Sequence, residues 1–417
     1  MEANTASLAE DKANPLLALR VRDFRLFWLA LVTQVVGQHV FAFTLGWLAF
    51  EVTGSSAQLG FIHLCIFLPQ FALTLLGGVL ADRVDARKLI GAAQVAAAIA
   101  MIMVGVATML GVVQLWHLAL GAFLWGASAS IDEPARASFF PRLLPRTLLR
   151  SAVPLISMAF GSSRIVAPSL AGFLIAAAGA PTTFLVGAAA VSTMIAVLFL
   201  VRPTLAAARP HGSVLDNFTA SLHYIRANEV FARTIVVALL HASLAMGYVH
   251  MLPVFAKDVL QVDSRGLGIL SSAAGVGALT GFLSYAWLQR RISWRNLLVG
   301  SLTVYNLALL GLAFSEWYWV SFFSILVTGL CHAYFLTCAQ VMLQTSVDDQ
   351  YRGRVMSIFA LVWSLMFLSG FLLNAAGEWV GPRLALAGGA ITMLAYVWLS
   401  LARAIALRDL VLAPKPS

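Results

Sequence analysis

The sequence predicts an all-α membrane protein with twelve transmembrane helices, arranged as two pseudo-symmetric halves of six. The first observation behind this is composition: of 417 residues, 60% are hydrophobic and 11% are charged, and the mean hydropathy is +0.88. Soluble domains are far more polar, so a chain of two or three soluble domains is excluded. The second observation is a series of long apolar stretches. The third is a set of short fragments that recur at a constant offset.

The apolar stretches define the predicted helices, because crossing a bilayer takes about 20 residues of α-helix. We expect helices at residues 24–50, 57–81, 89–111, 115–135, 150–178, 182–201, 234–256, 266–288, 297–315, 317–341, 355–377 and 384–406. Cys65, Cys331 and Cys338 fall within these stretches and lack the spacing of metal ligands. We therefore expect them to be small packing residues, and no metal site is predicted.

The basic residues predict the orientation of the helices. Of 27 Lys and Arg residues, Lys257, Arg265 and Arg383 fall in loops on one side, Arg164 falls inside a helix, and the other 23 fall in segments on the opposite side. Because Lys and Arg near helix ends resist translocation, we expect a multi-pass protein of the cytoplasmic (inner) membrane with both termini in the cytoplasm. The net charge of +9 is then a topology signal, and no nucleic-acid partner is predicted.

Four fragments of the first half recur in the second half at an offset of 208 positions. They are Leu59-Gly60 and Leu267-Gly268, Arg83 and Arg291, Arg87 and Arg295, and Leu89 and Leu297. Weak internal repetition of this kind is typical of membrane proteins built from two related helical bundles. Asp82 has Arg290 as its counterpart, so the halves are expected to share an architecture without sharing this acid.

The repeat and the polar segments predict the domain organisation. We expect a cytoplasmic tail at 1–23, a six-helix bundle at 24–201, a linker at 202–233, a second bundle at 234–406 and a cytoplasmic tail at 407–417. In the linker, Ser213 is placed to cap a short helix. The apolar residues of one face of that helix are Val214, Phe218, Leu222 and Ile225. This pattern predicts an amphipathic helix on the cytoplasmic membrane surface.

The loop between the second and third predicted helices carries an acid followed by clustered bases. It resembles the corresponding loop of the major facilitator superfamily, whose pattern is roughly G-x-x-x-D-R-x-G-R-R/K. The residues that fit are Gly78, Asp82, Arg83 and either Arg87 or Lys88. The alternative is a charged cytoplasmic loop that follows the positive-inside tendency, which explains the bases but has no use for the acid.

The resemblance implies that this loop is a conformational latch. Asp82 would hold the cytoplasmic ends of the two halves together through Arg352 or Arg354, at the start of the eleventh helix. The chain departs from the pattern at Asp85, where glycine is usual, and at Ala86, where a base is usual.

Longer phrases resemble one branch of the superfamily, the exporters related to the enterobactin exporter and to macrolide efflux proteins. These phrases are residues 51–55, 134–136, 143–146 and 351–356. Antiporters of the superfamily also tend to carry Gly-Pro-x-x-Gly-Gly in the fifth helix, and residues 167–172 resemble it through Pro168 and Gly172. Ordinary close packing of small residues is an alternative reading of that element.

Charged side chains inside the predicted helices are costly, at least about 2.5–3.5 kcal/mol at the bilayer centre, and so point to function. Arg164 lies fourteen residues after Arg150, near mid-membrane, where it can bind an anionic substrate group or compensate a buried carboxylate. Asp132 and Glu133 are within helical pairing reach of Arg136. We expect the local ion pair at Asp132, whereas Glu133 points to another face and can titrate or meet Arg164.

The first helix lacks the acid that many proton-coupled exporters of this kind carry there. His39 is the natural substitute because imidazole titrates near physiological pH, and a hydrogen-bonded structural histidine is the alternative. Gln34 and Gln38 are four residues apart, so with His39 they are expected to form a polar strip facing a substrate and coupling cavity. The residues expected on the opposite wall are His241, Tyr248, His332, Tyr334, Gln340 and Asn374.

These features predict a secondary active transporter that exports a small organic molecule by alternating access in exchange for protons. The sequence has no phosphate-binding glycine loop, nucleophile elbow or metal cluster, so we expect no enzyme activity and no cofactor. The expected partners are a small-molecule substrate, protons and the lipid bilayer, and the expected state is a monomer. The alternatives are an uptake or facilitated-diffusion carrier and, from another class, a receptor or scaffold that does not transport.

Overall fold

A computed structural model describes residues 16–201, 229–347 and 365–401 of the chain. It forms two compact units. Among the described residues, unit 1 holds 16–52 and 65–201, and unit 2 holds 53–64, 229–347 and 365–401. Residues 53–64 thus belong with the second half, although the repeat places them in the first. The predicted linker helix and both predicted tails lie largely outside the described residues.

Unit 1 consists of long helices joined by short turns. Its elements are η1 (Leu17–Arg20), α2 (Arg22–Thr53), α3 (Ser56–Arg83), α4 (Ala86–Met109), α5 (Leu115–Phe139), η2 (Phe140–Leu143), η3 (Arg146–Leu148) and α6 (Leu149–Leu200). The first turns of α3, up to residue 64, belong to unit 2. Helix α6 covers the fifth and sixth predicted helices, because it breaks at Gly179, whose φ is 81°. Only glycine adopts that backbone conformation easily, and Pro181 follows two residues later. Helix α4 packs along α5 and α6.

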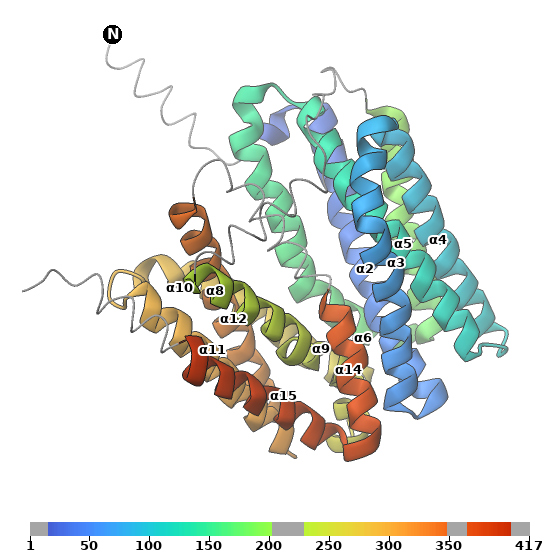
Figure 1. The fold of residues 1–417 in the computed structure, drawn as a ribbon. Helices are drawn as coiled ribbons and strands as arrows, with labels where there is room; N and C mark the ends of the chain where they lie inside the picture. The colour runs from blue at the N-terminus through green and yellow to red at the C-terminus, as the bar shows by residue number, and fades with distance from the viewer. Residues whose placement is uncertain (1–15, 202–228, 348–364, 402–417) are drawn as a thin grey trace, which may run out of the picture. The chain divides into compact units, whose positions relative to one another are not determined.

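Unit 2 contains several helices that are interrupted. Its elements are α8 (Glu229–Leu240), η4 (His241–Ala245), α9 (Tyr248–Val254), η5 (Phe255–Val259), α10 (Ser264–Leu288), α11 (Trp294–Phe314), α12 (Tyr318–Ser346), α14 (Leu365–Val380), α15 (Pro382–Tyr396) and η7 (Val397–Leu401). The segments η4, η5 and η7 are π-helical. Helix α10 packs along α12, and α11 packs against both α12 and α15 (Figure 1).

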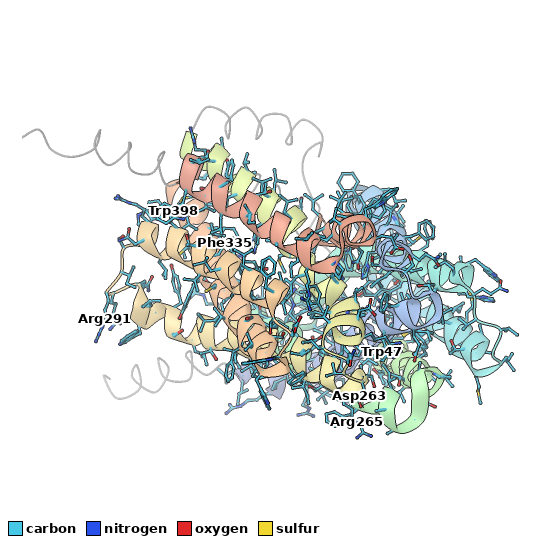
Figure 2. The ribbon with its side chains drawn as sticks, turned by 90° about the horizontal axis from the view of Figure 1, so that it is seen from below. Trp47, Asp263, Arg265, Arg291, Phe335 and Trp398 are labelled. Atoms are coloured by element: carbon cyan, nitrogen blue, oxygen red, sulfur yellow. The ribbon has the colours of Figure 1, made fainter. Side chains whose placement is uncertain are left out.

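Apolar side chains occupy both the interior and the outer surface of each unit. Phe335 lies in the interior of unit 2 with 2% of its surface exposed, whereas Trp398 lies at the periphery (Figure 2). Trp379 and Phe199 are also largely exposed. Within the described residues, nine helices are long and apolar enough to cross a membrane, and α14 is a shorter apolar helix. Exposed apolar surface on such helices is what a lipid environment requires.

The structure carries the internal repeat in its helix boundaries. Helices α3 and α10 begin at Ser56 and Ser264, and α4 and α11 begin at Ala86 and Trp294, so both pairs are separated by 208 positions. In unit 2, Asp263 and Arg265 lie at the start of α10, and Arg291 follows its other end (Figure 2). The offset found in the sequence therefore relates equivalent helices.

Helix starts at equivalent positions are also capped in the same way. The side chain of Ser55 accepts a hydrogen bond from the Gln58 N–H at 3.2 Å, and that of Asp263 accepts one from the Gly266 N–H at 3.0 Å. Likewise, Asp85 accepts from the Arg87 N–H and Ser293 accepts from the Asn296 N–H. A helix N-terminus leaves backbone donors without intrahelical acceptors, and such caps satisfy one of them.

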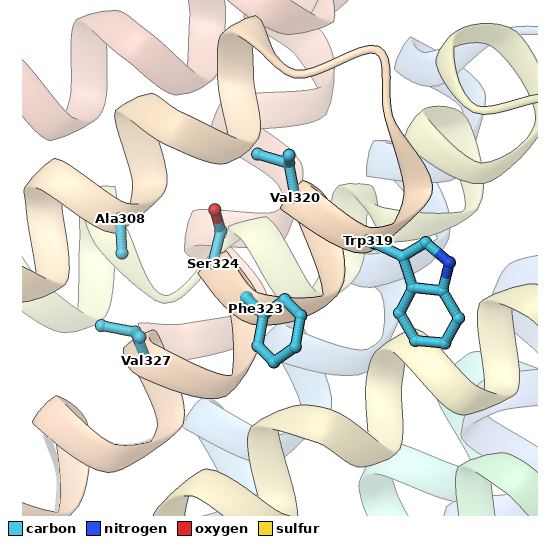
Figure 3. Close-up of a pocket in the computed structure, with 6 residues that line it drawn as sticks. All are labelled: Ala308, Trp319, Val320, Phe323, Ser324 and Val327. Atoms are coloured by element: carbon cyan, nitrogen blue, oxygen red, sulfur yellow. The ribbon is translucent and has the colours of Figure 1, made fainter.

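An open apolar depression of about 530 Å³ lies between α11 and α12 (Figure 3). Its lining residues are Ala308, Trp319, Val320, Phe323, Ser324 and Val327. Trp319 and Phe323 are more than half exposed. A shallow surface with almost no polar group suits lipid chains better than a substrate that needs polar anchors. The polar clusters of the two units are therefore better candidates for the functional site.

Candidate functional site

The charged loop joins α3 to α4, and Asp85 has a definite structural role there. Its carboxylate accepts a hydrogen bond from the Arg87 N–H at 2.9 Å and caps α4. Its φ is −57°, which any residue adopts, so glycine is not needed at this position. Arg87 and Lys88 occupy the first turn of α4. The departure from the family pattern at this position therefore gives α4 its N-cap.

The remaining residues of the predicted latch lie outside what the structure describes. Gly78, Asp82 and Arg83 belong to the last turns of α3, but their side-chain placement is not part of the description. Arg352 and Arg354 fall between the described ranges. The latch accordingly stays a prediction.

A buried ion pair within α5 is hydrogen-bonded to α2 inside unit 1. The Arg136 Nε donates to an Asp132 carboxylate oxygen at 2.6 Å, and the Gln34 amide donates to the same oxygen at 2.8 Å. Asp132 and Gln34 are almost completely buried. The Arg136 guanidinium also lies 5.1 Å from the centre of the Phe160 ring of α6. The predicted Asp132–Arg136 pair is confirmed, and Gln34 lies inside the unit as its partner.

A small cavity of about 160 Å³ lies beside this ion pair. Its lining residues are Phe27, Leu31, Glu133, Arg136, Ala137, Phe140, Ile156 and Phe160. Pockets for drug-sized ligands occupy roughly 300–1,000 Å³, so this cavity alone is too small for one. Glu133 is exposed at its edge, on a different face of α5 from Asp132. The two neighbouring acids therefore differ, one buried and paired and the other accessible.

His39 is held between α2 and α6. Its Nδ1 lies 2.9 Å from the Val35 carbonyl oxygen of its own helix and 3.4 Å from the Ser163 hydroxyl. Arg164, the next residue of α6, is exposed and acts electrostatically on His39. Gln38 beside it is partly exposed. A titratable ring and a cation thus lie near each other in unit 1, while their predicted place in a substrate cavity stays a prediction.

The antiporter-like element of α6 lies one to two turns beyond Arg164. Ala167 and Ala171 pack with Val40 of α2, and Gly172 is buried, while Pro168 is partly exposed. Small residues at these positions let α2 and α6 approach closely. Close helix packing is what the contacts of this element display.

Two histidines of the predicted second wall are hydrogen-bonded to each other inside unit 2. The His241 Nε2 and the His332 Nδ1 are 3.1 Å apart, and the two rings are nearly parallel. His241 is 1% exposed and His332 is 7% exposed. The Tyr305 ring lies edge-on to His241 at 4.6 Å, and the Phe335 ring lies 4.8 Å away. Both histidines therefore belong to the interior of unit 2.

The other predicted wall residues also bind within unit 2. The Tyr334 hydroxyl is 2.7 Å from the Ser284 hydroxyl. The Asn374 amide is completely buried and donates to the carbonyls of Gly370 and His250 at 2.8 and 3.2 Å. Asn374 thereby connects α14 to α9.

Unit 2 contains a polar contact that sequence reasoning missed, which we call the α3–α14 junction. It comprises residues 55–63 at the start of α3 with residues 370–378 of α14 and His250 of α9. One Glu378 carboxylate oxygen accepts three hydrogen bonds at 3.0–3.1 Å, from the Ala57 N–H and from the hydroxyls of Ser55 and Ser56. Glu378 thus caps a helix 321 positions earlier in the chain.

The junction continues along the same face of α3. A Cβ added at Gly60 would lie 3.0 Å from the Phe371 carbonyl oxygen and 3.1 Å from the Asn374 Cβ, so the two helices are in close contact there. Further along, the centres of the His63 and His250 rings are 4.2 Å apart. The Ser-Ser pair before an apolar helix signals a cap in the sequence, but nothing local identifies Glu378 as its partner.

The comparisons with known proteins agree on one kind of protein. A family model described as "Transmembrane secretion effector" matches residues 13–412. The staphyloferrin A transporter of Staphylococcus aureus is 24% identical, over 83% of this chain and 87% of its own length. The multidrug efflux pump Tap of Mycolicibacterium fortuitum is also 24% identical, over 84% of this chain and 89% of its own length. Macrolide efflux protein A of Streptococcus pyogenes is 22% identical, over 83% of this chain and 86% of its own length.

Solved structures show the same fold. The nucleoside transporter NupG superposes with a TM-score of 0.73 at 15% identity, covering 91% of this chain and 98% of the transporter. A bacterial homologue of the lysosomal transporter Spinster superposes with a TM-score of 0.71 at 16% identity, covering 92% and 97%. At these identities the likeness concerns the fold alone.

Proposed function

Because the chain belongs to the transmembrane secretion effectors, a family of major facilitator transporters and not of enzymes, we propose that it exports a small organic molecule in exchange for protons. The observation that carries the proposal is the family match over nearly the whole chain, together with relatives that are efflux transporters. The predicted superfamily, helical membrane fold and efflux type of transport are thereby confirmed.

Alternating access requires two halves and contacts that form and release. The repeat supports the division into bundles at 24–201 and 234–406, joined by the linker at 202–233 and flanked by the tails. The distribution of Lys and Arg supports an inner-membrane location with both termini in the cytoplasm. The α3–α14 junction is then on the outer side, opposite the predicted latch. We further propose that a single chain is the transporting unit.

Arg164 supports an anionic group on the substrate. Its guanidinium is on α6, beside His39, and is exposed within unit 1. Guanidinium binds carboxylates through two parallel hydrogen bonds, so a carboxylate-bearing substrate fits this position better than a cationic one. Exchange for one proton has enough energy available, since a charge crossing 100 mV contributes about 2.3 kcal/mol before any pH gradient is added.

Transport into inverted membrane vesicles tests the proposal. We would compare staphyloferrin A, erythromycin and ethidium, with and without an acid-inside pH gradient, in vesicles with and without the protein. We expect protein-dependent accumulation that falls when nigericin removes the gradient, and an Arg164→Lys loss that is larger for the carboxylate-bearing probe. Accumulation that is independent of the gradient would instead indicate facilitated diffusion. Binding without accumulation of any probe would indicate a receptor.

A further inference from the structure

The hydrogen-bonded pair of His241 and His332 is a cluster of titratable groups for which the fold gives no structural need. The rings come from different elements, the π-helical η4 and helix α12, and both are buried. A packing role would be met by two apolar residues of similar size at lower desolvation cost. Two buried imidazoles in contact with each other therefore point to a role in binding protons.

The geometry of the pair suits the binding of one additional proton. A bond between the His241 Nε2 and the His332 Nδ1 needs one N–H and one lone pair, so in the neutral pair one ring donates and the other accepts. The donor ring's other nitrogen keeps a lone pair, and a further proton there turns the contact into a charge-assisted bond, which is shorter and stronger. The pair can thus hold a positive charge that a single buried imidazole would hold poorly.

The aromatic contacts of His241 offset part of the cost of charging a buried ring. The aromatic rings of Tyr305 and Phe335 lie within 5 Å of its centre, and aromatic rings attract cations. The titratable groups around it are Tyr305 from α11 and, beyond that ring, Tyr248 of α9 and Cys331 of α12. The Tyr305 hydroxyl donates to the Ala245 carbonyl at the end of η4.

Charged residues on the elements that pack against η4 lie near the ends of those elements. Arg233 is in the second turn of α8 and donates to the Ser400 carbonyl at 2.9 Å. Glu378 is at the end of α14 and Arg383 is at the start of α15, where it pairs with Glu316 at 3.0 Å. These charged side chains have partners of their own and lie several residues along their helices from the contact with η4.

A π-helical segment gives the pair a route to conformational change. π-Helical turns are rare and occur frequently at functional sites. Segment η4 packs against α14, and a Cβ added at Gly247, just after η4, would clash with Ser369 of α14. Helix α14 in turn holds Asn374 on the His250 carbonyl and Glu378 on the start of α3. A charge gained in η4 therefore acts on the helix that forms the α3–α14 junction.

We propose that the His241–His332 pair is the proton-binding site of the exchange, and that its protonation alters the packing of η4 on α14. This inference rests on the proposed function, because it assigns the coupling ion of that exchange to a site. It moves the coupling role away from His39, the residue favoured by the sequence. His39 is held by a carbonyl of its own helix, whereas His241 and His332 can share a proton between two elements.

Solid-state ¹⁵N NMR of the histidine-labelled protein in lipid tests the site without any substrate. Spectra from about pH 4 to about pH 9 bracket the usual imidazole pKa. We expect two ring signals that are coupled through one hydrogen bond and that change together with pH, and both should be altered in His241→Gln and in His332→Gln. If neither ring changes its protonation over this range, the inference is overturned whatever the transport result.

Vesicle transport of the best of the three probes provides the second test. His241→Gln and His332→Gln should lose the gradient-driven part of transport and keep substrate counterflow, which needs no net proton movement and also reports correct folding. The matched control is His117→Gln at the start of α5, where glutamine can keep the capping contact to Gln114.

The two proposals fail in different ways. Absence of gradient-driven transport by the parental protein counts against proton exchange, and the NMR titration still decides whether the pair binds a proton. If the parental protein responds to the gradient and the two variants respond equally, the assigned site is wrong while proton exchange stands. A loss confined to His39→Gln would return the coupling role to α2.

Discussion

Helices α3 and α10 start at equivalent positions of the repeat, but the carboxylate at each start comes from a different part of the chain. In α10 it belongs to Asp263, the residue directly before the helix. In α3 the residue before the helix is Ser55, and the carboxylate comes from Glu378 of α14. Both arrangements satisfy backbone donors at a positive helix end.

The difference determines which cap can be released. A cap supplied by the adjacent residue stays near the helix in every conformation. A cap supplied by another helix leaves when that helix moves, and the donors at the start of α3 can then bind water. Helix α3 therefore carries a contact that can open without unfolding the helix, while α10 carries a permanent one. Alternating access needs at least one contact that can open, as the cap from Glu378 can.

The largest expected effect comes from separating α3 from α14 sterically. Gly60→Val places a side chain where a Cβ already meets the Phe371 carbonyl at 3.0 Å, and overpacking of this kind costs about 1–3 kcal/mol. We expect faster amide hydrogen exchange in residues 53–64 and unchanged exchange at the start of α10. Gly91→Val is the control, since a Cβ there meets only Leu198 at 4.0 Å. Equal effects of the two substitutions would contradict close packing at Gly60.

Removing the remote carboxylate should have the next largest effect. Glu378→Ala takes the acceptor from the Ala57 N–H and from two hydroxyls, and losing a helix N-cap costs about 1 kcal/mol, up to about 2. Exchange at the first amides of α3 should rise about tenfold, since 1.4 kcal/mol is a factor of ten. Glu316→Ala, which removes the surface partner of Arg383, is the control. Unchanged exchange in α3 would show that Glu378 does not cap it.

The sequence predicted the helices well, for a physical reason. Apolar runs of about 20 residues have few alternatives in a bilayer, and the offset of 208 positions reappears as the separation of helix starts. The local Asp132–Arg136 pair was also predictable, because residues four apart are neighbours on a helix. These features depend on composition and local spacing alone.

Contacts between distant segments could not be predicted in this way. Glu378 follows an apolar run with no local sign of a partner, because its partners lie more than 300 positions earlier. His241 and His332 were both expected in a cavity, but their mutual hydrogen bond depends on how η4 and α12 pack. The π-helical turn at His241 has no sequence signature comparable to that of a helix cap.

A smaller effect is expected from the local cap of α10. Asp263→Ala removes the acceptor of the Gly266 N–H at 3.0 Å and should cost about 0.5–2 kcal/mol, whereas Asp263→Asn keeps an acceptor and should cost little. The measurement is amide exchange in residues 264–268, with residues 53–64 as the internal reference. If Asp263→Ala accelerates exchange in α3 as well, the two helix starts are not independent and the comparison fails.

The smallest net effect is expected when α3 is given a cap of the α10 type. Ser55→Asp places a carboxylate at the position equivalent to Asp263, where it can accept from the Gln58 N–H in place of the serine hydroxyl. With Glu378 present, two carboxylates share the helix start and repel each other, so the gain is largely cancelled. In the Ser55→Asp background, Glu378→Ala should therefore cost far less than it does in the parental protein, and the double-mutant cycle measures the difference.

The same double variant should keep α3 capped while losing its contact with α14. If transport survives in it with altered kinetics, capping and gating are separable properties of this helix start; if the two substitutions are simply additive in amide exchange, Glu378 and residue 55 do not act on the same donors.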